Sequence, residues 1–181
     1  MSRILQLKIS LVGLKPMIWR RLLVEDSISF YKLHNIIQKA MGWENYHLFE
    51  FDQGSLYIGI PEGGDYSSEI KDSKKIKLSH VFTEEKQILN YIYDFGDSWK
   101  HKILVEKILV KDHLQKYPLC IDGNRSCPPE DCGGVWGYEE MLEIKSDKSH
   151  PEYEEKIVEW LGEDFDPEKF DIEEVNKLLK K

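Results

Sequence analysis

The chain has 181 residues, a hydrophobic content of 41%, a charged content of 32% and a net charge of −8. This composition is typical of a folded protein rather than a disordered one, and no apolar run approaches the roughly 20 residues that a membrane-spanning helix needs. The N-terminal sequence lacks the features of a signal peptide, and three cysteines argue against a disulfide framework, so we expect a cytoplasmic protein.

The charge is unevenly distributed. Residues 130–181 contain 17 acidic and 7 basic side chains, whereas the preceding part has a small net positive charge. The acidic part would repel nucleic acid. The candidates for a local basic patch are Arg20, Arg21, Lys71, Lys74, Lys75 and Lys77. A solvated face is the simpler interpretation of these charges, with a nucleic-acid contact as the alternative.

Alternating apolar residues predict a strand over 5–11 and, after a turn at 13–16, an antiparallel strand over 18–24. In the second strand Trp19 and Arg21 share one face, while Arg20 lies on the other face between apolar residues. An arginine in that position is expected to lie at a strand edge or to find a carboxylate partner.

A helix is predicted over 30–41, with Ser29 as its N-cap and Gly42 at its end. Further strands are predicted at 43–51, 56–60, 88–93 and 100–110. Residues 61–72 are expected to form a mobile loop, and 76–82 either a short strand or a single turn.

The stretch 118–138 contains all the cysteines, adjacent prolines and a pair of glycines. We expect a shaped loop there, neither helix nor strand, around which the chain is organised. Amphipathic helices follow at 137–145, 151–161 and 172–179, the last with Asp171 as its cap. The expected fold is therefore a single α+β domain over 1–181. It has a mainly antiparallel sheet of five or six strands and one helix in 1–117, the loop at 118–138, and about three helices in an acidic part at 139–181.

One group of candidate site residues lies in the turn between the strands at 88–93 and 100–110. Asp94, Asp97 and His101 could bind a metal or transfer protons, and Trp99 could form a wall of the site. Aspartate is also a common turn former, so these acids could instead only hold the turn.

The cysteines Cys120, Cys127 and Cys132 have the spacing C-x6-C-x4-C. Zinc prefers four nitrogen or sulfur ligands, usually with a C-x2–4-C element, which only the second gap approaches. A fourth ligand would have to come from elsewhere, and His101 is the natural candidate. Alternatively, Cys132 precedes two glycines and a helix start, where its thiol could act as a nucleophile. Buried, unreactive cysteines are the default.

The second candidate group is Arg125, Glu130 and Asp131, near or after the two prolines that stiffen the loop. A rigid loop that presents two acids and an arginine could bind a ligand. It could equally be an internal latch, with its carboxylates tied to Arg20 or Arg21.

The sequence also contains, in order, W-R-R at 19–21, G-W-x3-H-L at 42–48, Y-D-F-G-D-S-W-x-H at 93–101 and C-P-P-E-D-C-G-G at 127–134. Together these strings resemble the plasmid pRiA4b ORF-3-like family. The resemblance covers nearly the whole chain and implies a single α+β domain of largely unknown biochemical function. Relatives include passenger proteins of insertion elements that are labelled resolvase-like, which would associate the chain with plasmids and transposable elements.

The leading hypothesis from the sequence is a binding or accessory domain. Its polar cleft would lie between the turn at 94–101 and the loop at 125–134, with Arg125 holding an anionic group. The first alternative is a metal-dependent enzyme, of hydrolytic type and with zinc as the metal, which would use the cysteines and His101 or the pair Asp94 and Asp97. The second alternative is a nucleic-acid-associated module.

Overall fold

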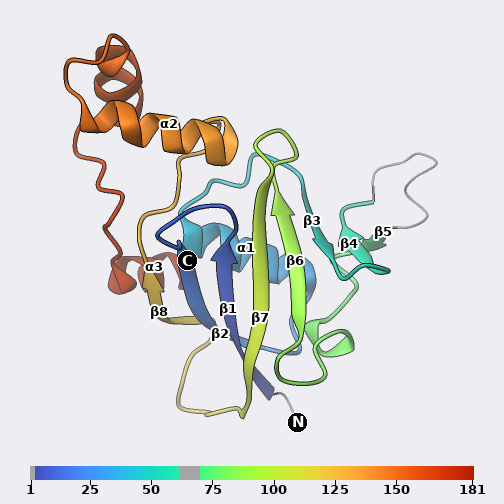
Figure 1. Ribbon diagram of the computed structural model, residues 1–181. Helices are drawn as coiled ribbons and strands as arrows, with labels where there is room; N and C mark the ends of the chain where they lie inside the picture. The colour runs from blue at the N-terminus through green and yellow to red at the C-terminus, as the bar shows by residue number, and fades with distance from the viewer. Residues whose placement is uncertain (1–2, 62–69) are drawn as a thin grey trace.

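A sheet of eight strands forms the centre of the computed structural model, which describes residues 3–61 and 70–181 (Figure 1). The strand order is β5-β4-β3-β6-β7-β1-β2-β8, and neighbours are antiparallel except β4 and β5. The fold is α+β as expected, but the described residues form more strands than the five or six expected. The strands are β1 (Arg3–Leu11), β2 (Trp19–Glu25), β3 (Phe49–Asp52), β4 (Tyr57–Gly59), β5 (Ile70–Asp72), β6 (Ile88–Tyr93), β7 (Trp99–Val110) and β8 (Leu119–Asn124).

The inner face of the sheet is covered by helix α1 (Phe30–Met41), which lies behind the strands in Figure 1. The alternation of β1 places Leu5, Leu7 and Ile9 in the core, as predicted. The hydroxyl of Ser29 accepts a hydrogen bond from the backbone N–H of Lys32 at 3.2 Å. The helix stops at Gly42, whose φ of 94° suits glycine. Local signals therefore set both ends of this helix.

The stretch 118–138 is not all loop, contrary to expectation. Its first part is β8, which pairs with β2 at the sheet edge, and its last part is the start of α2 (Gly134–Ser146). The side chain of Asn176 brackets the open edge of β8: its Oδ1 accepts from Cys120 N at 2.9 Å, and its Nδ2 donates to Cys120 O at 2.8 Å. Because β8 depends on these long-range partners, the local sequence does not show it.

The helices of the C-terminal part pack in two separate places. Helix α2 and the π-helix η3 (Glu154–Leu161) pack on each other beyond one end of the sheet and share a small core of their own. Helix α3 (Ile172–Leu179) instead packs beside α1 and β8 (Figure 1). Asp171 caps α3 as predicted, since its Oδ1 accepts from the backbone N–H groups of Glu173 and Glu174.

The remaining differences from expectation concern short segments. Residues 78–80 form a 3₁₀ turn, η2 (Leu78–His80), which settles the ambiguity over 76–82. The loop expected at 61–72 lies mostly outside the described residues, although its end forms β5. Strand β3 begins only at Phe49, so residues 43–48 form a connection rather than a strand. Across 3–61 and 70–181, no helix combines the length and apolar character needed to cross a membrane.

Candidate functional site

The connection at 43–48 is held against the core by a chain of hydrogen bonds through His34. Gln38 Nε2 donates to the hydroxyl of Tyr91 at 3.0 Å, and that hydroxyl lies 2.8 Å from His34 Nδ1. On the other side of the ring, Nε2 lies 2.6 Å from Oδ1 of Asn45. Since an amide oxygen only accepts, Nε2 is the protonated nitrogen and Nδ1 accepts from the tyrosine. The network anchors the connection two residues before His47.

The loop at 125–133 is tied to the same connection. The indole N–H of Trp43 donates to the carbonyl of Pro128 at 2.9 Å, and the backbone N–H of Glu44 donates to Oε2 of Glu130 at 2.9 Å. The other oxygen of Glu130 accepts from the hydroxyl of Tyr93. Burial, and then the hydrogen bond to Glu130, raise the pKa of Tyr93. Glu130 is thus an internal latch, but its partners are not the arginines expected.

The turn after β6 forms the third part of the site. Asp94 is in the left-handed region (φ 57°), and its Oδ1 accepts from Gly96 N at 2.8 Å, which leaves Oδ2 directed elsewhere. Asp97 Oδ2 accepts from Gly133 N at 3.2 Å. A Cβ on Gly134 would lie 2.4 Å from the carbonyl oxygen of Asp97. The turn and the loop therefore meet in direct contact, and glycine at 134 permits it.

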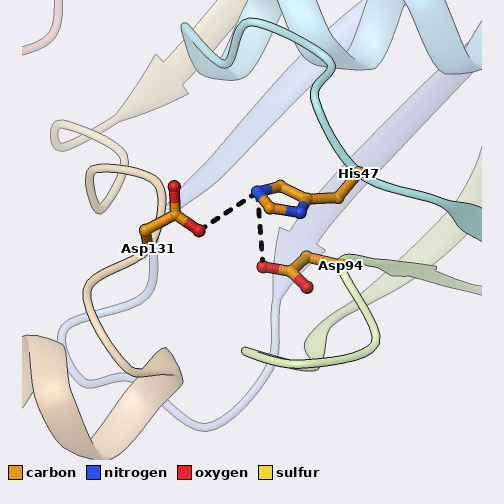
Figure 2. A group of neighbouring side chains, drawn as sticks. All are labelled: His47, Asp94 and Asp131. Carbon is orange, nitrogen blue, oxygen red and sulfur yellow. Dashed lines mark ion pairs between the residues drawn. The ribbon is translucent and has the colours of Figure 1, made fainter.

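Three side chains converge where these segments meet: His47, Asp94 and Asp131 (Figure 2). His47 Nε2 lies 3.2 Å from Oδ1 of Asp131 and 3.8 Å from Oδ2 of Asp94. One ligand atom from each residue fits within 4.8 Å of the other two, and no other group of three or more such residues occurs in 3–61 and 70–181. Asp94 is buried, whereas the side chain of Asp131 is 67% exposed. The site is therefore open to solvent on the Asp131 side.

The ring nitrogen Nε2 of His47 lies near two carboxylates without bonding to either. Nε2 is shielded from solvent, yet it makes no aligned hydrogen bond within the described part of the chain, although two carboxylate oxygens are near. In a tetrahedral site with metal–ligand bonds of about 2.1 Å, neighbouring ligand atoms are about 3.4 Å apart and point at the metal, not at each other. The two measured separations bracket that value. The oxygens of Asp94 and Asp131 also lie within 4.8 Å of each other, so the three atoms are close enough for one cation to contact all of them.

The residues that precede these three side chains are themselves connected. The hydroxyl of Tyr93 accepts from the backbone N–H of Tyr46 at 3.1 Å and donates to Glu130. Tyr46, Tyr93 and Glu130 come immediately before His47, Asp94 and Asp131. The hydroxyl of Tyr93 therefore links the residues that precede all three members of the group.

Of the residues predicted from the sequence, Asp94 and Asp131 belong to this group. Asp97 and Glu130 support it through the contacts above. Trp99 and His101 do not reach it, because both are buried in the core. His101 Nδ1 donates to the carbonyl of Trp99 at 2.9 Å, and burial lowers the pKa of His101 to about 4.

Arg125 also lies away from the group. Its Nη1 donates to the carbonyl of Pro16 at 3.1 Å, and its Nη2 pairs with Glu168. The side chain is almost fully buried, so these contacts hold the loop to the turn at 13–16 and to the segment before α3. Its Nε is buried without a hydrogen-bond partner in the described part of the chain, and the anion-binding role expected from the sequence stays a prediction.

The structure does not bring Cys120, Cys127, Cys132 and His101 together as one set of ligands within its described residues. Cys120 is on β8 and His101 is on β7, three strands apart in the sheet, which corresponds to about 14 Å at the usual strand spacing. Burial raises the pKa of both Cys127 and Cys132 to about 12. A thiol that remains protonated at neutral pH is a poor nucleophile.

The basic residues do not form one patch. Arg20 and Arg21 lie on opposite faces of β2, and Arg21 pairs with Glu106 and Asp122. Lys71 lies on β5, six strands away from β2 in the sheet order, or about 29 Å. The two basic groups that the sequence suggested are therefore separate surfaces.

His47 was absent from the candidates drawn from the sequence. Its one signal was its place in the string G-W-x3-H-L, whereas its period-two pattern with Phe49 suggested a strand residue. The convergence depends on three loops that are distant in sequence, which a local pattern cannot reveal.

Comparison with known proteins agrees with the resemblance inferred from the sequence strings. The model of the plasmid pRiA4b ORF-3-like protein family matches residues 3–174. The chain belongs to this family. The pRiA4b ORF-3-like chain is 33% identical to the uncharacterized protein y4hQ of Sinorhizobium fredii (strain NBRC 101917 / NGR234) over 180 residues, which cover 98% of this chain and 91% of that protein.

A solved structure supports the fold of this pRiA4b ORF-3-like chain. The crystal structure of MM3350, a protein of unknown function from Methanosarcina mazei Go1, is 46% identical and superposes with a TM-score of 0.87. The match covers 95% of this chain and 97% of MM3350. Neither name states an activity, so the function has to be argued from the site.

Proposed function

We propose that the protein is a binding domain whose polar site, between the turn after β6 and the loop at 125–133, holds a divalent metal ion. The observation that carries the proposal is the convergence of His47 Nε2 with one oxygen each of Asp94 and Asp131. Imidazole and carboxylate ligands suit first-row divalent metals, and zinc tolerates a site with three protein ligands.

The supporting contacts favour a site built for a cation. Metal ligands are usually held by a surrounding layer of hydrogen bonds. Here Asp94 accepts a hydrogen bond from Gly96 N, and the hydroxyl of Tyr93 links the backbone of Tyr46, before His47, to the carboxylate of Glu130, before Asp131.

Three protein ligands leave a coordination position open on the exposed side, next to Asp131. Asp131 also lines a pocket of about 250 Å³ between α2 and η3, with Met141 and Trp160 among its walls. A ligand bound to the metal would have adjacent space there. We favour binding over hydrolysis because the neighbouring acid, Glu130, already accepts hydrogen bonds with both of its oxygens.

The experiment is a calorimetric titration of metal-free, untagged protein with Zn²⁺, in parallel with Mg²⁺. We expect one zinc per chain and much weaker binding of magnesium, which prefers all-oxygen sites. The variants His47→Gln and Asp131→Asn should each weaken zinc binding by at least about a hundredfold, because loss of a ligand should cost at least as much as the roughly 10–100-fold effect of changes around a ligand.

Two matched controls make the result decisive. His113→Gln removes an exposed histidine outside the group and should leave binding unchanged. Cys127→Ser tests the thiol alternative and should also leave it unchanged. The proposal fails if zinc does not bind, if both site variants bind normally, or if Cys127→Ser abolishes binding.

A further inference from the structure

Arg20 is a buried cation without a counter-charge. It is only 3% exposed, and no carboxylate of the described residues lies within ion-pair distance of it. The other buried arginine, Arg125, pairs with Glu168, and the half-buried Arg21 pairs with two acids. Buried charges in proteins are almost always paired, because an unpaired charge loses its hydration without compensation. The expected carboxylate partner of Arg20 is therefore missing within the described chain.

The contacts of Arg20 orient its guanidinium without neutralising it. Nε donates to the carbonyl of Ala40 at 2.9 Å, and Nη1 donates to the carbonyls of Trp19 (2.9 Å) and Asn124 (3.0 Å). The guanidinium carbon lies 4.6 Å from the ring centre of Phe170. Nη2 has no hydrogen-bond partner among residues 3–61 and 70–181. The group is thus held in place with one donor nitrogen unused.

Arg20 lines a pocket of about 270 Å³ between α1, the loop at 125–133 and α3. The pocket walls are largely apolar and include Met41, Phe165, Phe170, Val175 and Leu178. Its size lies just below the usual range of small-molecule sites, about 300–1,000 Å³, so it would suit a small ligand.

The charged residues that line the pocket besides Arg20 have no net charge. Lys169, Asp171 and Glu174 are exposed, and together with the half-buried Lys39 they contribute equal numbers of positive and negative charges. Cys127 also lines the pocket, and its thiol is neutral because burial raises its pKa to about 12. The interior therefore presents one fixed positive charge against an apolar wall.

We propose that this pocket binds a small carboxylate with an apolar body, its carboxylate accepting hydrogen bonds from Nη2 of Arg20. A single positive charge matches a monoanion, whereas a phosphate monoester would bring a charge closer to −2. A hydrogen bond from the charged guanidinium to a carboxylate is charge-assisted and therefore stronger than one between neutral groups. This site is separate from the proposed metal site and does not depend on it.

The test is a calorimetric titration with hexanoate, which has a carboxylate and a short apolar chain. Hexylamine and 1-hexanol, with the same chain length and a different head group, are the comparators. We expect one hexanoate per chain with a dissociation constant of about 1 mM or below, and at least tenfold weaker binding of both comparators.

Arg20→Gln should weaken hexanoate binding at least tenfold. Because this change also removes contacts to three carbonyls, a second variant, Leu178→Trp, fills the pocket while leaving Arg20 intact and should abolish binding. Arg21→Gln is the matched control on the opposite face of β2, and Asp131→Asn is the control in the metal site; neither should affect hexanoate.

The proposal is overturned if hexanoate does not bind, if hexanol binds as well as hexanoate, or if Leu178→Trp binds normally. Loss of binding in Arg21→Gln equal to that in a folded Arg20→Gln would also overturn it. Failure of zinc binding would leave these results unaffected, so the two proposals can be judged separately.

Discussion

The hydroxyl of Tyr93 donates a hydrogen bond to the carboxylate of Glu130, 37 residues further along the chain. The same hydroxyl accepts from the backbone of Tyr46. It therefore joins the connection before β3, the end of β6 and the loop at 125–133. The three side chains of the proposed metal site lie one residue beyond these three contacts.

Tyr93→Phe should lower zinc affinity about tenfold and the free energy of unfolding by about 1–3 kcal/mol. The reason is that Glu130 loses a buried donor and the loop that carries Asp131 is released. Zinc calorimetry and urea unfolding measure the two effects. Tyr57→Phe is the control, since its hydroxyl makes no hydrogen bond with the described residues. Equal zinc affinity in wild type and Tyr93→Phe would contradict the positioning role.

Gly134→Ala should be clearly more destabilising than Gly42→Ala. Both glycines have positive φ, at 70° and 94°, so alanine costs about 1–2 kcal/mol at either position. At Gly42 nothing lies within 4 Å of an added Cβ, whereas at Gly134 the carbonyl oxygen of Asp97 lies 2.4 Å away. We expect an extra cost of at least about 1 kcal/mol at 134 by urea unfolding, together with weaker zinc binding. Equal free energies of unfolding for the two variants would contradict the prediction, because they would show that the contact between the turn after β6 and the loop at 125–133 does not contribute to stability.

Stability should fall as the pH falls from about 6.5 toward 4. Burial lowers the pKa of His34 and of His101 from 6.5 to about 4. As the pH falls, the histidines of the unfolded chain are protonated before those of the folded chain. The stabilisation of the folded state is therefore fully present above pH 6.5 and is lost between pH 6.5 and pH 4. Each histidine contributes up to about 3 kcal/mol to this loss.

The pH dependence can be assigned with one variant. His34→Gln should show a shallower fall in unfolding free energy between pH 6.5 and 4.5, because about one proton fewer is taken up on unfolding. His113→Gln, which changes an exposed histidine, should keep the slope of the wild type. Urea unfolding at several pH values provides the measurement, and parallel curves for wild type and His34→Gln would disprove the assignment.

The thiols of Cys127 and Cys132 should react slowly in the folded protein. Burial raises the pKa of each from 9.0 to about 12, so the thiolate fraction at pH 7.5 is lower by about a thousandfold. A chromogenic disulfide reagent should therefore label them slowly in native buffer and rapidly, with Cys120, in denaturant. Rapid native labelling of Cys132 would instead restore the hypothesis of a nucleophilic cysteine.

Several elements could be predicted from the sequence because their signals are local. The alternation of β1, the bounds of β6, the two caps of α1 and the cap of α3 all depend on residues within a few positions of one another. The α+β class and the family follow from the same kind of information, because long strings such as C-P-P-E-D-C-G-G can be recognised in the sequence without knowledge of contacts.

Short edge elements could not be predicted in this way. Strand β8 exists through its pairing with β2 and the bracket from Asn176, and β5 through its pairing with β4. Neither segment, LCIDGN in β8 or IKD in β5, shows a clear alternation of apolar and polar residues, so the hydrogen-bond partners decide that it is a strand.

The same distinction applies to function. The sequence by itself determined that the acids after β6 and at 130–131 are presented by shaped turns, and that two of the cysteines, Cys127 and Cys132, flank the second pair of acids. Only the tertiary structure decided that His47 completes a group with Asp94 and Asp131, that the cysteines do not, and that Arg20 is buried unpaired beside a pocket. The physical reason is that these features depend on contacts between segments that are far apart in sequence, which long-range hydrogen bonds and core packing fix and which no local pattern records.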